Sequence, residues 1–256
     1  MMELADEIGV MPCTALSVMD RIGLAMARRK EGIILKGVVE MDEAGLGGKE
    51  MKKPEENRLF PGGGFGGKQG VFCMVERGDH GRVVTSAVPD MPVQNTKGEW
   101  ITAPNFSREV IFPIIRKYVD PSSIVCTDEG AVYRALVRKK LARLHFSVNH
   151  NDGEYVNYPD HPKLKKAYSN TAESRWSALK RLYRNNNQWG KDKVQMHLDI
   201  SDFRWNETRV YIKNRKGEVV FARRRAPTME AFEVFISCCF GIEVSRKDLK
   251  SMRGVK

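Results

Sequence analysis

Apolar residues recur with helical spacing in the first thirty residues of the chain. Leu4, Ala5 and Ile8 form one apolar stripe, and a second stripe begins beyond Pro12 after a break at Gly9. The pattern predicts two short helices over residues 3–29. Two such helices are typical of a helix-turn-helix, although the packing of any helical hairpin accounts for the same pattern, so both interpretations stay open.

From residue 33 the pattern changes to Val- and Ile-rich segments that are typical of strands. Three of them, separated by glycines, predict a three-stranded meander over residues 33–42, 70–76 and 82–88. The elements predicted next are a helix over 108–118, a strand over 123–127, a basic helix over 131–141, a strand over 144–148 and a helix over 170–183. A meander followed by alternating helices and strands predicts an α/β fold with a mixed sheet covered by helices on both faces.

Polar and basic residues dominate the chain beyond residue 184. The pattern there predicts a helix that ends near Trp205, a hairpin over 210–221 that turns at Lys216–Gly217, and a last apolar helix over 229–240. No internal repeat is visible.

The composition narrows the class of protein. Lys and Arg number 43 against 32 Asp and Glu, a net charge of +11, which suits a protein that binds a polyanion, although solubility alone is the alternative. No apolar run approaches the roughly 18 to 20 residues of a membrane span, and the acidic amino terminus is unlike a signal peptide. The five cysteines contain no C-x-x-C pair, so neither a zinc knuckle nor a disulfide framework is predicted. We expect an unsecreted protein without a membrane partner.

Three acidic residues stand at the ends of predicted elements. Asp42 ends the first strand, Asp128 follows the strand over 123–127, and Glu173 opens the helix over 170–183. The carboxyl ends of neighbouring strands share one crevice, so the two aspartates are expected to face the same site. Carboxylates that hold two divalent cations serve phosphoryl transfer. Each acid alone is explained by a turn or a helix start, but the three together indicate a metal site.

Other residues near these acids are expected to have different roles. Glu40 shares the strand face of Asp42, whereas Glu43 and Glu129 should point away from the site because successive strand residues face opposite sides. Trp176 falls on the apolar stripe of its helix and is expected in the core. Lys180 follows Glu173 by seven residues, so both side chains leave the same helix face about 10.5 Å apart along the axis.

Several sequence blocks resemble one family. These blocks are residues 38–43, 47–49, 127–128, 170–181 and 202–206, and together they look like the DDE transposases of bacterial insertion sequences, in the ISXO2-like group. The likeness covers roughly residues 3–209. It implies a ribonuclease H-like core with a mixed five-stranded sheet. It also implies that Asp42, Asp128 and Glu173 are the metal-binding triad, for two Mg²⁺ or Mn²⁺ ions, and that Lys180 takes part in the catalytic site.

Three departures from the group stand out. Its members commonly carry a cysteine-rich zinc ribbon before the helix-turn-helix, and no such cysteine pattern occurs in this sequence. Tyr168 stands where a histidine is expected shortly before Asn170. The basic segment beyond residue 209 has no counterpart in the group. The expected organisation is therefore an incomplete helix-turn-helix-like DNA-binding segment over 1–30, a catalytic domain over 31–209 and a basic extension over 210–256.

Basic residues cluster in the same part of the chain as the acids. Around a carboxylate site they would contact DNA phosphates, and the nucleic-acid-binding residues expected on this ground are Lys49, Arg138, Lys139, Lys140, Arg175, Lys180, Arg181 and Arg184. The glycine-rich run over 62–70 nearly spells a phosphate-binding loop, but Gln69 stands where Ser or Thr would bind magnesium. We interpret that run as part of a DNA-facing insertion or a solvated linker.

The function expected from these observations is metal-dependent cleavage of insertion-sequence ends and their transfer to target DNA. The partners would be the terminal inverted repeats and target DNA, with the protein a homodimer or higher multimer in the bacterial cytoplasm, on the nucleoid. Two alternatives stay open. One is a catalytically inactive, transposase-derived DNA-binding protein, and the other is a nuclease that only hydrolyses DNA.

Overall fold

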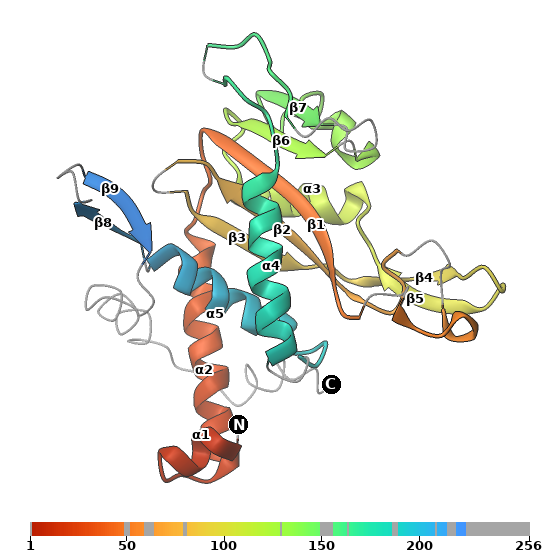
Figure 1. Cartoon of the computed structure of the whole chain (residues 1–256), viewed down its shortest axis with the longest axis vertical. Helices are drawn as coiled ribbons and strands as arrows, with labels where there is room; N and C mark the ends of the chain where they lie inside the picture. The colour runs from red at the N-terminus through yellow and green to blue at the C-terminus, as the bar shows by residue number, and fades with distance from the viewer. Residues whose placement is uncertain are drawn as a thin grey trace. The chain divides into compact units, whose positions relative to one another are not determined.

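The computed structural model describes residues 2–48, 52–58, 64–78, 81–128, 130–148, 156–162, 164–185, 189–207, 209–213 and 219–223 (Figure 1). The chain divides into two compact units. One unit is formed by Met1–Ile33 together with Trp189–Lys256, and the other by the uninterrupted stretch Ile34–Gln188.

The unit over 34–188 is built on a mixed five-stranded sheet with the strand order β3-β2-β1-β6-β7. The strands are β1 (Val38–Leu46), β2 (Gln69–Glu76), β3 (Val83–Ala87), β6 (Ile124–Asp128) and β7 (Leu144–Val148). β1, β2 and β3 are antiparallel neighbours, whereas β6 runs parallel to both β1 and β7. The predicted mixed sheet is therefore confirmed.

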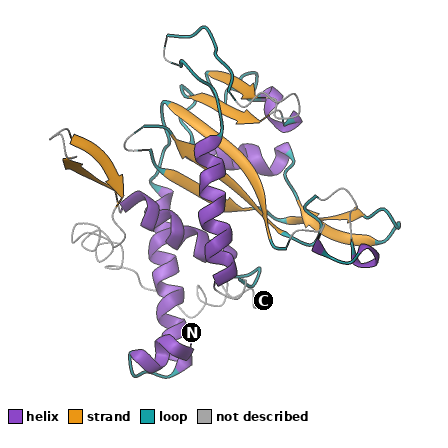
Figure 2. Cartoon of the chain, viewed as in Figure 1, coloured by secondary structure: helices purple, strands orange, loops and turns teal. Residues whose placement is uncertain are grey.

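Helices cover both faces of this sheet. In Figure 1, α4 (Asn170–Asn185) lies in front of the strands and α3 (Arg108–Tyr118) lies behind them. β2 accordingly buries every residue from Gln69 to Val75 without the alternation of a strand that has one solvent-facing side. α3 has the bounds that its helical spacing predicts, and Figure 2 shows helices beside the strands of the sheet.

The first strand differs from the sequence prediction at both ends. It begins at Val38 because residues 33–37 turn toward the sheet, with Leu35 bridged to Val119 and Gly37 at a φ of 74°. It continues to Leu46 because pairing with β2 extends over Asp42–Leu46, although Gly45 is a poor strand former. Asp42 therefore lies inside β1 and does not end it.

A second sheet contains two strands that the sequence analysis did not predict. β4 (Asp90–Gln94) and β5 (Trp100–Pro104) follow β3 and precede α3 along the chain, and they pair antiparallel with each other. In Figure 1 they project away from the five-stranded sheet. β4 contains Pro92 and polar residues, so it lacks the alternating apolar pattern from which a strand is predicted. The short 3-10 helix η2 (Glu55–Asn57) belongs to the segment between β1 and β2.

The basic α-helix expected over residues 131–141 is not formed. The segment begins as a 3-10 helix, η3 (Ala131–Ala135), with the N–H of Leu136 donating to the carbonyl of Tyr133, and Lys140 has a φ of 55°. Val132, Tyr133 and Val137 have low helix propensity, and burial of Tyr133 and Leu136 takes precedence over helical regularity. The prediction of an α-helix here was wrong.

The other unit is helical in its described part. α1 (Met2–Glu7) and α2 (Pro12–Glu31) confirm the two predicted helices. α5 (Val194–Glu207) packs against α2, although the domain boundaries predicted from the sequence include it in the catalytic domain. Met196 of α5 lies so close to Gly23 of α2 that a β-carbon on residue 23 would be 2.2 Å from the Met196 side chain. A buried ion pair joins Lys30 to Asp199, and a partly buried one joins Lys193 to Asp20.

The predicted carboxyl-terminal hairpin is present. β8 (Arg209–Lys213) pairs antiparallel with β9 (Val219–Arg223), while its turn at Lys216–Gly217 and the helix expected over 229–240 lie outside the described residues. In the described ranges, no helix has the length and apolar character needed to cross a membrane.

Candidate metal centre

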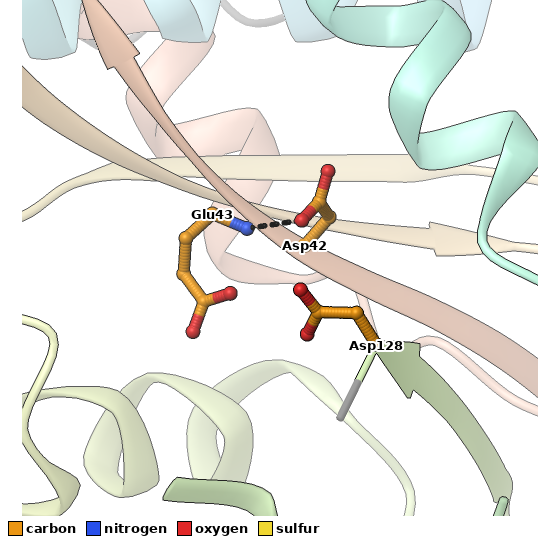
Figure 3. Close-up of side chains that lie close together, drawn as sticks. All are labelled: Asp42, Glu43 and Asp128. Carbon is orange, nitrogen blue, oxygen red and sulfur yellow. Dashed lines mark hydrogen bonds between the residues drawn. The ribbon is translucent and has the colours of Figure 1, made fainter. Parts of the chain in front are cut away.

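Three carboxylates converge where β1 and β6 separate. Asp42, Glu43 and Asp128 each place one oxygen within 4.8 Å of the others (Figure 3). The register explains the site, because β1 pairs with β6 only from Val38 to Glu40 and then continues without it, while Asp128 is the last residue of β6. Hard divalent cations prefer such carboxylate oxygens, so the group could hold a metal ion.

The orientation of the Glu43 side chain differs from the sequence prediction. Strand alternation predicted that its side chain points away from the site, but in Figure 3 its carboxylate lies close to that of Asp128. Among the described strands, none pairs with the β6 side of β1 beyond Glu40, so the longer Glu43 side chain can reach the same opening as Asp42. Glu129, for which the same orientation was expected, lies outside the described residues.

Asp42 is held through both of its carboxylate oxygens. Oδ1 accepts a hydrogen bond from the backbone N–H of Glu43 at 2.9 Å, and Oδ2 accepts one from the indole Nε1–H of Trp176 at 2.6 Å. Trp176 is 5% exposed on α4, so the predicted burial is confirmed, but its hydrogen bond to Asp42 was not foreseen. Donors of this kind orient metal ligands in protein sites.

Burial and mutual repulsion make this group unfavourable in its fully ionised form. Burial raises the pKa of Asp42 to about 6, opposed by the Trp176 hydrogen bond and reinforced by the charge of Asp128. Burial also raises the pKa of Glu43 to about 7, opposed by the phenol of Tyr133 and reinforced by both aspartates. A bound cation would offset this repulsion, so the three residues fit the metal that the carboxylate pattern predicts.

Glu173 lies near this group but outside it. It stands in the first turn of α4, its side chain is exposed, and its Oε1 accepts a hydrogen bond from the Ser169 hydroxyl at 3.4 Å. Its charge nevertheless contributes to the raised pKa of Asp42. The structure thus brings together Asp42 and Asp128 of the expected triad, adds Glu43, and leaves Glu173 outside the 4.8 Å group.

Most of the basic residues expected to bind nucleic acid are exposed where the structure describes them. The exposed ones are Arg138, Lys139, Lys140, Lys180, Arg181 and Arg184. Arg175 differs from the expectation, because it is 3% exposed and its guanidinium is not presented at the surface. Lys49 lies outside the described residues.

Comparisons with known proteins find similarity to transposases. Residues 34–206 match the family model of the ISXO2-like transposase domain. An uncharacterized transposase-like protein of Haemophilus influenzae (strain ATCC 51907 / DSM 11121 / KW20 / Rd) is 27% identical over 110 residues, which cover 43% of this chain and 81% of that protein. No solved structure matches the chain.

Proposed function

Because the chain belongs to the family of ISXO2-like transposase domains, we propose that it is a DDE transposase that cuts the ends of an insertion sequence and joins them to target DNA. The observation that carries this proposal is the convergence of Asp42, Glu43 and Asp128 at the point where β1 and β6 separate. A scaffold protein without catalysis has no need for half-buried carboxylates that repel one another.

The metal-binding residues would be Asp42 and Asp128, with Glu173 completing a second site and Glu43 as a further candidate ligand. Two Mg²⁺ or Mn²⁺ ions, when bound, would supply an activated water and stabilise the charge that develops on the scissile phosphate. Trp176 would hold the Asp42 carboxylate in its ligating orientation through the 2.6 Å hydrogen bond.

The proposed reaction has two steps at phosphorus. Water attacks the phosphate at the element end, and the bond to the 3′ oxygen breaks and leaves a free 3′ hydroxyl. That hydroxyl then attacks a phosphate of the target DNA in line, forms the new phosphodiester bond and displaces the target 3′ oxygen. No covalent bond between protein and DNA is required. Lys180, on the same helix as Glu173, would contact the phosphate beside the scissile one.

The DNA would be held by exposed basic side chains. Those of α4 and of the segment after η3 belong to the same unit as the carboxylates, and the whole chain carries a net charge of +11. We further propose that α1 and α2 act as a helix-turn-helix-like DNA-binding segment, that the terminal inverted repeats are the specific ligand, and that the protein works as a homodimer or higher multimer.

Strand transfer separates this proposal from its two rivals. A catalytically inactive, transposase-derived protein would bind the element ends and leave them uncut whatever divalent metal is added. A nuclease that only hydrolyses would cut the ends without joining them to target DNA. A metal-dependent joined product in a strand-transfer assay is expected for the protein proposed here.

The test of the site uses amide substitutions, which keep side-chain shape and remove the charge that would hold cations. Asp42→Asn, Asp128→Asn and Glu173→Gln should each keep folding and DNA binding close to those of the unchanged protein while end cleavage is lost. Glu43→Gln should reduce cleavage if Glu43 is a ligand. Full strand transfer by any one variant would remove that residue from the site.

A further inference from the structure

A fully buried carboxylate lies two residues before Asp42 on the same strand. Glu40 on β1 is 0% exposed, and both of its oxygens accept hydrogen bonds. Oε1 accepts from the Nε–H of Arg77 at 2.6 Å and from the hydroxyl of Thr171 at 3.0 Å, and Oε2 accepts from the backbone N–H groups of Thr171 at 2.8 Å and Ala172 at 3.2 Å. These contacts occupy the carboxylate, so Glu40 serves α4 and Arg77 rather than a cation.

The contacts to Thr171 and Ala172 make Glu40 a cap for α4 that comes from another element. α4 begins at Asn170, and the N–H groups of a first helical turn have no partner within the helix. A carboxylate satisfies these donors and is also favoured by the helix dipole. Glu173 follows Ala172 directly, so the cap joins the strand that carries Asp42 to the helical turn that carries Glu173.

Arg77, which follows β2, extends this connection to the segment that enters α4. One terminal nitrogen of its guanidinium donates to the carbonyl of Lys166 at 2.6 Å, the other donates to the carbonyl of Tyr168 at 2.6 Å, and its Cζ lies 3.7 Å from the centre of the Tyr168 ring. Its backbone N–H donates to the carbonyl of Val38 at 2.8 Å. Arg77 is thus bonded to β1 at Val38 and Glu40 and to the last residues before α4.

We propose that the Glu40–Arg77 pair is a positioning device that sets the place of Glu173 relative to Asp42. This inference rests on the proposed function, because it assigns the two carboxylates to one reaction. Burying two charges is costly, so the pair is not explained by its charges stabilising the interior. The charged pair fixes the position of the start of α4 relative to β1, because its hydrogen bonds join defined atoms of the two elements.

The test compares two Glu–Arg pairs on neighbouring strands. Glu40→Gln keeps the side-chain shape and removes the charge that caps α4. Glu76→Gln is the matched control, because the carboxylate of Glu76 pairs with Arg82 at 3.1 Å and accepts the backbone N–H of Lys36, outside α4. Two measurements need neither DNA nor catalysis: amide hydrogen exchange at residues 171–173 and calorimetric titration with Mn²⁺.

Glu40→Gln should speed exchange at residues 171–173 at least 10-fold and weaken Mn²⁺ binding on the order of 10- to 100-fold, whereas Glu76→Gln should change neither. In end cleavage, Glu40→Gln should lower kcat by a similar factor with KM for DNA unchanged. Thr171→Val removes one bond to Glu40 and keeps the side-chain volume, so it should weaken Mn²⁺ binding by a smaller factor. It decides the question if Glu40→Gln does not fold.

The inference is overturned if Glu40→Gln, or Thr171→Val in its place, matches the Glu76→Gln control in exchange and in Mn²⁺ affinity. Failure of the proposed function gives a different result. An unchanged protein that binds Mn²⁺ but never cuts DNA would contradict the assignment as a transposase, and the exchange and titration data would still show whether the pair positions α4.

Discussion

Replacing Trp176 with phenylalanine would remove one hydrogen-bond donor from the metal centre and keep an aromatic ring in the same buried place. The carboxylate of Asp42 accepts from two donors, the indole Nε1–H of Trp176 at 2.6 Å and the backbone N–H of Glu43 at 2.9 Å. The substitution removes the first and keeps the second. The substitution therefore tests whether orientation of Asp42 by α4 matters for metal binding.

The size of the effect follows from the charge on the acceptor. A hydrogen bond to an ionised group contributes about 1.5 to 3 kcal/mol. Among the contributions to the Asp42 pKa, this bond is the largest that opposes burial, so its loss should raise that pKa further above about 6. Protons would then compete more strongly with the cation, and Mn²⁺ affinity near pH 7 should fall on the order of 10-fold or more.

Calorimetric titration with Mn²⁺ at pH 6.5 and pH 8 measures this directly. Trp176→Phe should lose more affinity at pH 6.5 than at pH 8, because proton competition weakens as the pH rises. Trp100→Phe is the matched control, since Trp100 is 70% exposed on β5 and belongs to a different sheet from Asp42. Equal Mn²⁺ affinities for the two variants at both pH values would refute the positioning of Asp42 by Trp176.

Three further outcomes follow from the same structure. Without metal, the free energy of unfolding should fall as the pH rises from about 4 to 7, because the folded pKa values of Asp42 and Glu43 are about 6 and about 7 and the unfolded chain releases those protons at lower pH. Glu43→Gln should make this fall smaller. Denaturation experiments in which the free energy of unfolding rises over that pH range would contradict the prediction. Lys180→Ala should slow end cleavage more than Arg184→Ala at matched DNA occupancy, since Arg184 lies one turn farther along α4, and equal effects would make Lys180 an ordinary counter-charge. DNA affinity should fall with salt at a log-log slope of roughly −5 for six phosphate contacts in electrophoretic titrations, and a flat dependence would mean that the net charge serves solubility.

The sequence predicts that the two aspartates share one site, although only Asp128 ends its strand and Asp42 lies inside β1. The orientation of Glu43 could not be predicted, because alternation describes a strand that is paired on both sides, whereas β1 beyond Glu40 pairs with β2 alone among the described strands. The pairing of β1 with β6 ends at Glu40, and this depends on the tertiary structure, so residues 38–46 alone do not predict it. Adjacent acids beyond such a pairing are a signal for which a sequence search could look.

Trp176 and the β4–β5 hairpin show two other limits. Helical spacing places Trp176 in the core, yet the partner of its N–H depends on how α4 lies across β1, which local pattern cannot give. The hairpin turns at Asn95, whose side-chain oxygen accepts the N–H groups of Lys97 and Glu99, with Gly98 at a φ of 78°. Asn and Gly are turn residues, but Pro92 conceals the strand before them.

The division of the chain has a consequence for synthesis on the ribosome. α2 packs against α5, and Lys30 is paired with Asp199, which follows it by 169 residues. At about 5 to 20 residues per second, α2 therefore waits roughly 10 to 30 s for its partner helix, while the uninterrupted stretch Ile34–Gln188 emerges complete. We expect the carboxylate-bearing unit to fold first during translation, and the contact of α2 with α5 to form only after residues 194–207 have been made.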